Sequence, residues 1–310
     1  MRKLWHYLVN HVRQDFHLTQ YLLVLIFIFV CIIVNYYLDF EDSIIDHQTG
    51  FRKFILFFLT HAGTYIIPVL LAKKFKPDLI NLNRQFWIRS MFALTLLSAD
   101  RSFLFLESHL FALLNTQLFV WGYKVINNLS GTLYIILPFL IFYILTDRST
   151  NNFYGLTKKP NDLKPYFILL AIMVPIIIGA SFLPGFQKQY PMYVSTTAHD
   201  YLGVPEWLTV AGYELAYAIN FVSIEFFYRG FLILGLTAFL GRSSILPMAC
   251  LYCSLHFGKP MPEAISSIFG GYILGVIAFE TKSIWGGILV HVGIAWLMEV
   301  IAFMQSSYNN

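Results

Sequence analysis

The sequence contains few charged residues and few cysteines. Asp, Glu, Lys and Arg make up only 12% of its 310 residues, whereas soluble domains carry about 25%. This deficit excludes an ordinary soluble globular protein. The formal net charge is only +4 and no long basic run is present, so we expect no nucleic acid among the partners. The three cysteines lie in apolar runs, which argues against a disulfide framework.

Long hydrophobic segments are abundant instead. Hydrophobic residues make up 57% of the chain, and its mean hydropathy is +0.64. A membrane-spanning helix needs about 20 predominantly apolar residues. The segments that meet this requirement are 21–37, 54–72, 130–146, 166–184, 207–227, 264–280 and 284–304. Two weaker candidates are 90–113, which charged residues interrupt, and 243–257, which is short; 230–240 can continue the helix from 207. The sequence therefore predicts an all-α fold, a polytopic membrane helix bundle of about eight or nine transmembrane helices.

Residues 1–18 are predicted to form an amphipathic interfacial helix. Apolar residues recur there at helical spacing, and polar residues occupy the rest of the helical wheel: Trp5, Val9, Val12 and Phe16 against Arg2, Lys3, Asn10 and Arg13. This pattern is typical of a helix that lies on an anionic leaflet. A cationic leader that only obeys the positive-inside rule explains it equally well. The polar residues also interrupt any apolar core, so we expect no signal peptide.

The distribution of lysine and arginine predicts the topology. The N-terminus and the loop after the second span are basic, whereas the loop after the first span is acidic. The positive-inside rule then places the N-terminus in the cytoplasm, and we expect the plasma (inner) membrane as the location. The basic loop 147–165 divides a predicted N-terminal bundle, 19–165, from a predicted C-terminal bundle, 166–310.

Glu225 and Arg229 lie one helical turn apart in a segment that is predicted to span the membrane. Ionisable groups in hydrocarbon are costly and are usually paired or functional. In one reading the two residues form a structural ion pair, in which each charge lowers the other's cost of burial. In the other reading Arg229 keeps the carboxylate of Glu225 ionised, and Glu225 acts as a general base or a metal ligand. The sequence leaves both readings open.

Two histidines join this carboxylate as candidate site residues. His256 lies at the end of a short apolar run, and His291 lies inside the last one. Glu225, His256 and His291 match in type the three protein ligands of a catalytic zinc, which keeps a water in the fourth position. Zn²⁺ is therefore a predicted cofactor. Cys250 and Cys253, which precede His256, are interpreted as packing residues.

Three motifs occur in order in the C-terminal part of the chain: Glu225-Phe-Phe-Tyr-Arg229-Gly, then Tyr252-x-x-x-His256, then His291 in the last span. This order resembles the CPBP family, membrane proteases related to type II CAAX prenyl endopeptidases and to bacterial proteins linked to bacteriocin processing and self-immunity. The resemblance implies that 166–310 is a CPBP-like bundle of the catalytic type. It also implies that Glu225, Arg229, His256 and His291 are the site residues.

The chain departs from the family pattern at two positions. The family has Glu-Glu-x-x-x-Arg, Phe-x-x-x-His and His-x-x-x-Asn/Asp motifs. Ile224 stands in place of the first glutamate, which family members are thought to use to activate water. Ala295 stands in place of the amide or carboxylate that is thought to help stabilise the oxyanion. Tyr252 is a mild change from phenylalanine.

The resemblance implies an intramembrane metalloendopeptidase that hydrolyses a peptide bond of a membrane-associated, in some cases lipidated, peptide or protein. Glu225 would then take the base role, His256 and His291 would hold water or zinc, and a backbone or Tyr228 donor would replace the lost amide. One alternative is a non-catalytic family member that binds a membrane peptide as a scaffold or immunity factor. A second is a transporter, since intramembrane charges and glycine-interrupted helices also mark ion pathways.

Overall fold

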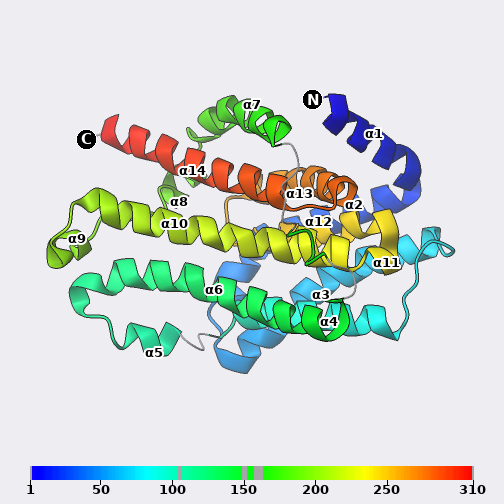
Figure 1. Cartoon of the computed structure of the whole chain (residues 1–310), viewed down its shortest axis with the longest axis horizontal. Helices are drawn as coiled ribbons and strands as arrows, with labels where there is room; N and C mark the ends of the chain where they lie inside the picture. Colours follow the sequence, from blue (N-terminus) through cyan, green and yellow to red (C-terminus); the bar gives the residue numbers. More distant parts are fainter. Residues whose placement is uncertain (1, 104–106, 149–151, 157–162, 309–310) are drawn as a thin grey trace. The chain divides into compact units, whose positions relative to one another are not determined.

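The described part of the chain is entirely helical. A computed structural model describes residues 2–103, 107–148, 152–156 and 163–308 (Figure 1). Within these ranges every regular element is a helix and no strand is present, which confirms the predicted all-α fold. The chain divides into two compact units. The first consists of Met1–Phe103, Arg148–Asn161 and Phe226–Trp285, and the second of Leu104–Asp147, Asp162–Glu225 and Gly286–Asn310.

The helices of each unit come from separate stretches of the chain. The first unit contains α1 (Arg2–Asp15), α2 (Leu18–Leu38), the π-helix η1 (Phe40–Ile45), α3 (Gly50–Phe75), α4 (Arg84–Asp100), the π-helix η3 (Phe226–Gly235), α11 (Thr237–Leu240), the 3₁₀ turn η4 (Gly241–Ser244), α12 (Ile245–Ser254) and α13 (Met261–Thr281). The second contains α5 (Glu107–Phe111), α6 (Thr116–Thr146), α7 (Lys164–Ala180), α8 (Pro184–Gln189), α9 (Ala198–Leu202), α10 (Glu206–Glu225) and α14 (Trp285–Tyr308), apart from the first residue of α14. The predicted division of the chain at 165 stays a prediction, and 149–151 and 157–162 of that loop lie outside the described residues.

Local sequence signals explain where several helices begin and end. The side-chain oxygens of Asn83 and Asn115 accept hydrogen bonds from the backbone at the starts of α4 and α6, at 3.0 and 2.9 Å. Such caps satisfy amide groups that have no partner within the helix. Asp39 ends α2 in the left-handed conformation, with φ of 49°, which asparagine and aspartate tolerate better than most residues.

Six helical stretches of the described chain are long and apolar enough to cross a membrane. They are Leu18–Leu38, Gly50–Phe75, Thr116–Thr146, Glu206–Gly235, Met261–Thr281 and Trp285–Gln305. Each coincides with a predicted span, and the predicted continuation of the helix from 207 is confirmed as far as Gly235. The predicted span 166–184 corresponds to α7, an apolar helix of only 17 residues. The predicted polytopic helical bundle is thus confirmed, with six full-length candidate spans among the described residues.

The two weaker candidates are not full-length helices. In the segment 90–113, α4 ends at Asp100 and a turn follows it at 101–102. In the segment 243–257, α12 has 10 residues and every one of them is buried. An apolar run of that length is more often a core helix than a span. Hydropathy alone cannot separate these cases, because protein and lipid are both apolar surroundings.

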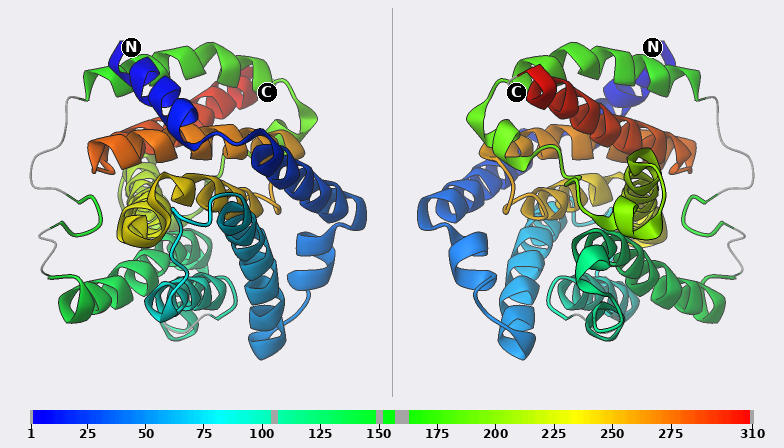
Figure 2. Two further views of the ribbon diagram at one scale, coloured as in Figure 1. Left: turned by 90° about the vertical axis from the view of Figure 1, so that its right-hand side faces the viewer. Right: turned by 90° about the vertical axis from the view of Figure 1, so that its left-hand side faces the viewer.

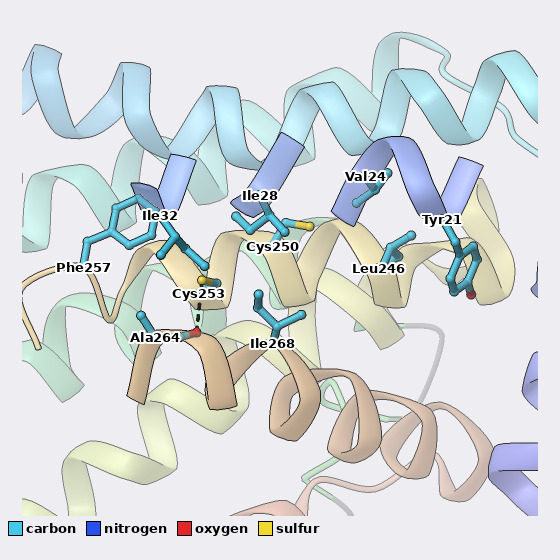
Figure 3. Packing of buried hydrophobic residues seen from close by; sticks show 10 residues of the cluster. All are labelled: Tyr21, Val24, Ile28, Ile32, Leu246, Cys250, Cys253, Phe257, Ala264 and Ile268. Atoms are coloured by element: carbon cyan, nitrogen blue, oxygen red, sulfur yellow. Dashed lines mark hydrogen bonds between the residues drawn. The ribbon is translucent and has the colours of Figure 1, made fainter. Parts of the chain in front are cut away.

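Helix α12 lies between α2 and α13 in the core of the first unit (Figure 3). The thiol of Cys253 donates to the carbonyl oxygen of Ala264 on α13 at 3.2 Å, and Cys250 packs in the same cluster. All three cysteines are free. The interpretation of Cys250 and Cys253 as packing residues is therefore confirmed, and tight packing around α12 fixes the position of the turn that follows it.

A helix is present at the N-terminus, as predicted. Helix α1 exposes Trp5 and Val12, as does the chain directly after it at Phe16, and α1 packs against α13 (Figure 2). A third face, which the sequence analysis did not identify, buries His11 and Asp15. The carboxylate of Asp15 pairs with Lys76 at 2.8 Å and accepts hydrogen bonds from Tyr21 and Ser243. Burial lowers the pKa of His11 to about 4. The location of α1 at a membrane surface stays a prediction.

In the second unit, α6 and α10 run side by side (Figures 1 and 2). An aromatic cluster fills the space beside them and reaches α14, and its buried members are Tyr193, Tyr213, Tyr217, Phe221 and Ala295. Glu299 of α14 is buried, and its carboxylate accepts hydrogen bonds from the backbone of Met192 and Tyr193 at 2.7 and 3.2 Å. Glu299 thus ties α14 to the segment that precedes α9.

Candidate active site

The last residue of α10 contacts the second turn of α14. Glu225 is fully buried, and its Oε1 lies 3.0 Å from Nδ1 of His291. A carboxylate accepts and does not donate, so Nδ1 carries the proton that it donates to Glu225. In the neutral imidazole, Nε2 of His291 is then an acceptor. Two residues that are 66 positions apart in the sequence therefore form a hydrogen-bonded dyad.

A glycine makes this contact possible. Gly287 lies one helical turn before His291 on α14. A Cβ atom at that position would lie 3.1 Å from Cδ of Glu225 and would clash directly with Oε2. Any larger residue would displace the carboxylate. In the sequence this glycine is only part of a pattern that favours close helix packing. In the structure the space beside it is filled by the carboxylate of Glu225.

Aromatic packing holds the histidine ring from another side. The ring centroid of Phe221, one turn before Glu225 on α10, lies 4.3 Å from that of His291. Phe221 belongs to the aromatic cluster of the second unit. Ala295 is buried in the same cluster, and Ile224 packs against it. The two positions at which the chain departs from the family pattern therefore share one apolar environment.

The arginine of the first motif contacts the aromatic residue of the second motif. Arg229 and Tyr228 lie on η3, the π-helical stretch that follows Glu225, and both are buried. The guanidinium carbon of Arg229 lies 4.3 Å from the ring centroid of Tyr252, and the ring of Tyr228 meets Tyr252 edge-on at 5.0 Å. A cation this close to an aromatic face is attracted by the ring quadrupole. Arg229 therefore helps to fix Tyr252.

Tyr252 in turn fixes His256, which lies in the turn after α12. Nδ1 of His256 lies 3.0 Å from the carbonyl oxygen of Tyr252, and the two rings meet edge-on at 4.8 Å. A carbonyl can only accept, so Nδ1 carries the proton, and Nε2 is the acceptor in the neutral ring. Arg229, Tyr252 and His256 thus form one chain of contacts within the first unit.

The predicted site residues therefore fall into two groups. Glu225 and His291 contact each other in the second unit, whereas Arg229 and His256 are linked through Tyr252 in the first. The predicted Glu225–Arg229 pair and the predicted three-ligand zinc site each combine residues of both units and stay predictions. Within the described ranges, no group of three or more His, Cys, Asp and Glu side chains is arranged to hold a metal ion.

The sequence did not indicate Phe221 or the contact between Arg229 and Tyr252. Phe221 has no polar atom and looks like any other aromatic residue of an apolar helix. Arg229 and Tyr252 belong to different motifs, and the spacing within each motif says nothing of a contact between them. The one usable signal was the aromatic position of the second motif, four residues before His256.

Comparison with known proteins supports the resemblance. Residues 206–297 match the model of a family described as Rce1-like, type II CAAX prenyl endopeptidase. Neither the curated proteins nor the solved structures that were compared contain a match. The matched region covers both groups of site residues and all three motifs. Together with the six candidate membrane-spanning helices, the match supports an integral membrane protein whose region 206–297 is similar to type II CAAX prenyl endopeptidases.

Proposed function

We propose, on the premise that residues 206–297 are of the type II CAAX prenyl endopeptidase kind, that the protein is an intramembrane endopeptidase. Its substrate is a membrane-associated peptide or protein, in which one peptide bond is hydrolysed. The observation that carries the proposal is the buried hydrogen bond between Glu225 and His291, at 3.0 Å. A carboxylate that orients a histidine is the arrangement by which many hydrolases prepare a general base.

In this proposal His291 is the general base and Glu225 orients it. Glu225 holds the tautomer that carries its proton on Nδ1, so Nε2 can take a proton from water. The oxygen of that water then bonds to the carbonyl carbon of the substrate. As the carbon–nitrogen bond breaks, the imidazolium returns the proton from Nε2 to the departing amine. Glu225 also stabilises the positive charge on the ring between these two proton transfers.

The first unit holds the other residues that the family resemblance implies, and we propose that His256 is a functional residue there. Nε2 of His256 is an acceptor, because Nδ1 donates to the backbone of Tyr252. Arg229 is a positioning residue that acts on His256 through Tyr252. Tyr228 lies beside Tyr252, and its hydroxyl is buried without a hydrogen-bond partner among the described residues. Tyr228 is therefore the candidate hydrogen-bond donor of this unit.

The steps above use no metal ion. Nδ1 of His291 donates to Oε1 of Glu225, so Nε2 is the ring atom of His291 that could bind a metal. A catalytic zinc needs three protein ligands, and the predicted third ligand, His256, belongs to the other unit. The zinc site stays a prediction, and every step above is carried by side chains.

The test is cleavage of a panel of prenylated and transmembrane peptides by the purified protein, read by mass spectrometry. We expect the wild type to cleave at least one peptide, and Glu225→Gln and His291→Ala each to lower the rate by about 10²–10⁴-fold. Glu214→Gln, which alters another carboxylate of α10, is the matched control and should retain activity. The proposal would be overturned by a Glu225→Gln variant that is fully active and elutes from a size-exclusion column like the wild type.

A second function is favoured by one observation. Ile224 and Ala295, the two departures from the family pattern, lie in the same hydrophobic cluster, so the polar groups of the family site are replaced by apolar side chains packed among aromatic residues. We propose as the alternative a non-catalytic protein that binds a membrane peptide. It predicts that the wild type binds peptides of the panel without cleaving any of them. It also predicts that Ile224→Glu combined with Ala295→Asn introduces cleavage.

A further inference from the structure

The end of the first membrane helix contacts the turn that carries His256. Asn35 is buried near the end of α2, and its Nδ2 donates to the carbonyl oxygen of Phe257 at 3.0 Å. The hydroxyl of Tyr36 lies 2.6 Å from the carbonyl oxygen of Lys259 and 3.2 Å from that of His256. These two residues lie about 220 positions before the turn and outside the region that matches the family model.

The turn follows a helix that is buried along its whole length. Its own backbone supplies a hydrogen bond, from the nitrogen of Lys259 to the carbonyl oxygen of His256 at 3.1 Å. The side chains of Asn35 and Tyr36 add hydrogen bonds to the carbonyl groups of Phe257 and Lys259, and Tyr36 also reaches that of His256. The turn is therefore held by α2 and not only by its own backbone.

The segment η1 supports the same turn. The backbone nitrogen of Glu41 donates to Oδ1 of Asn35 at 3.2 Å, and the Glu41 carboxylate pairs with Arg101. A Cβ atom at Gly258 would lie 3.1 Å from a carboxylate oxygen of Glu41 and 3.1 Å from one of Asp42. Gly258 thus allows η1 to approach closely, two residues after His256.

His256 is consequently fixed at two places. Its side chain is held by Tyr252, through the hydrogen bond from Nδ1 and the ring contact. Its main chain is held by Tyr36. We infer that Asn35 and Tyr36 are positioning residues that set the orientation of the His256 imidazole. The inference concerns the geometry of His256, and its catalytic consequence rests on the proposed function.

The experiment measures the reactivity of His256 directly. Detergent-purified protein is treated with diethyl pyrocarbonate, which modifies imidazole, and the rate at each histidine is followed by mass spectrometry of digests. Tyr36→Phe removes only the hydroxyl, and Asn35→Asp keeps the acceptor for Glu41 but removes the donor to Phe257. Tyr37→Phe is the matched control, because Tyr37 is the next residue and is 85% exposed.

We expect both variants to raise the modification rate of His256 by at least about fivefold, since the loss of local hydrogen bonds increases local opening. The rate at His291 should not change, and Tyr37→Phe should behave as the wild type. Unchanged reactivity of His256 in Tyr36→Phe and Asn35→Asp would overturn the inference. If these variants unfold, all histidines become reactive, the buried His61 included. In that case Gly258→Ala decides. Its added Cβ should push the turn away from η1 and raise the modification rate of His256, and an unchanged rate would overturn the inference.

A catalytic measurement separates this inference from the proposed function. If the wild type cleaves a peptide, Tyr36→Phe should lower kcat about tenfold with little change in KM, as expected for a misplaced reactive group. A change confined to KM would contradict the positioning role. If the wild type cleaves nothing, the proposed function fails, while the modification rates still decide whether α2 positions His256.

Discussion

Replacing Gly287 by alanine tests the Glu225–His291 dyad with the smallest possible change. The added Cβ would lie 3.1 Å from Cδ of Glu225 and closer still to Oε2, whereas carbon atoms in contact are about 3.5–4.0 Å apart. The carboxylate would have to move by about 1 Å or rotate to relieve this overlap. Either movement breaks the 3.0 Å hydrogen bond to His291.

The size of the effect follows from that bond. A hydrogen bond to a charged group contributes about 1.5–3 kcal/mol, which corresponds to a loss of about 10–150-fold in kcat/KM. The assay is peptide cleavage by purified Gly287→Ala protein, with thermal unfolding measured in parallel. Gly179→Ala on α7 is the matched control, because a Cβ there meets nothing within 4 Å. Activity of Gly287→Ala within about threefold of the wild type would refute the account of the dyad.

The remaining predictions concern acid–base behaviour, metal content and the first-unit contacts. Burial, opposed by Arg101, raises the pKa of Glu41 to about 7. The contribution of Glu41 to stability is therefore complete below its ordinary pKa of about 4.5 and is lost as the pH rises through about 7. Glu41→Gln should flatten the dependence of Tm on pH, and an unchanged profile would contradict this. The metal-free mechanism predicts that the purified protein holds less than one zinc per chain and that chelators leave cleavage intact. One zinc per chain, lost in both His256→Ala and His291→Ala, would instead establish a metal site. A double-mutant cycle of Arg229→Met and Tyr252→Leu should give a coupling energy of about 1–2 kcal/mol in unfolding, and simple additivity would show that the contact does not stabilise the protein.

The strongly hydrophobic helices could be predicted from the sequence, and the reason is physical. A run of about 20 apolar residues has few alternatives to a span, and all six full-length stretches were identified in this way. The failures were segments of intermediate length. Helix α4 ends at Asp100, and α12 is a core helix of 10 residues. Whether such a segment forms a span or a shorter helix depends on the helices that pack around it, and these come from other parts of the chain.

The candidate site was predictable in residue type but not in geometry. The cost of burying ionisable groups identified Glu225, Arg229, His256 and His291. Which of them contact one another depends on the packing of helices that are far apart in the sequence, as the contact between Glu225 and His291 shows. Asn35 and Tyr36 gave no signal, because polar residues at the end of a span usually mark only the membrane surface. Their role becomes visible once the orphan carbonyl groups of the turn after α12 are located.

The shared environment of Ile224 and Ala295 has an evolutionary consequence. Starting from this chain, a single change at Ile224 to glutamate would add a carboxylate to an aromatic cluster, and a single change at Ala295 to asparagine would add a buried amide. Burying a polar group without a partner costs about 1–3 kcal/mol, and a charge costs more. Each single change toward the family pattern therefore produces a destabilised protein. The same two single-change proteins are the intermediates of the opposite exchange, so selection for stability acts on the two positions as a pair.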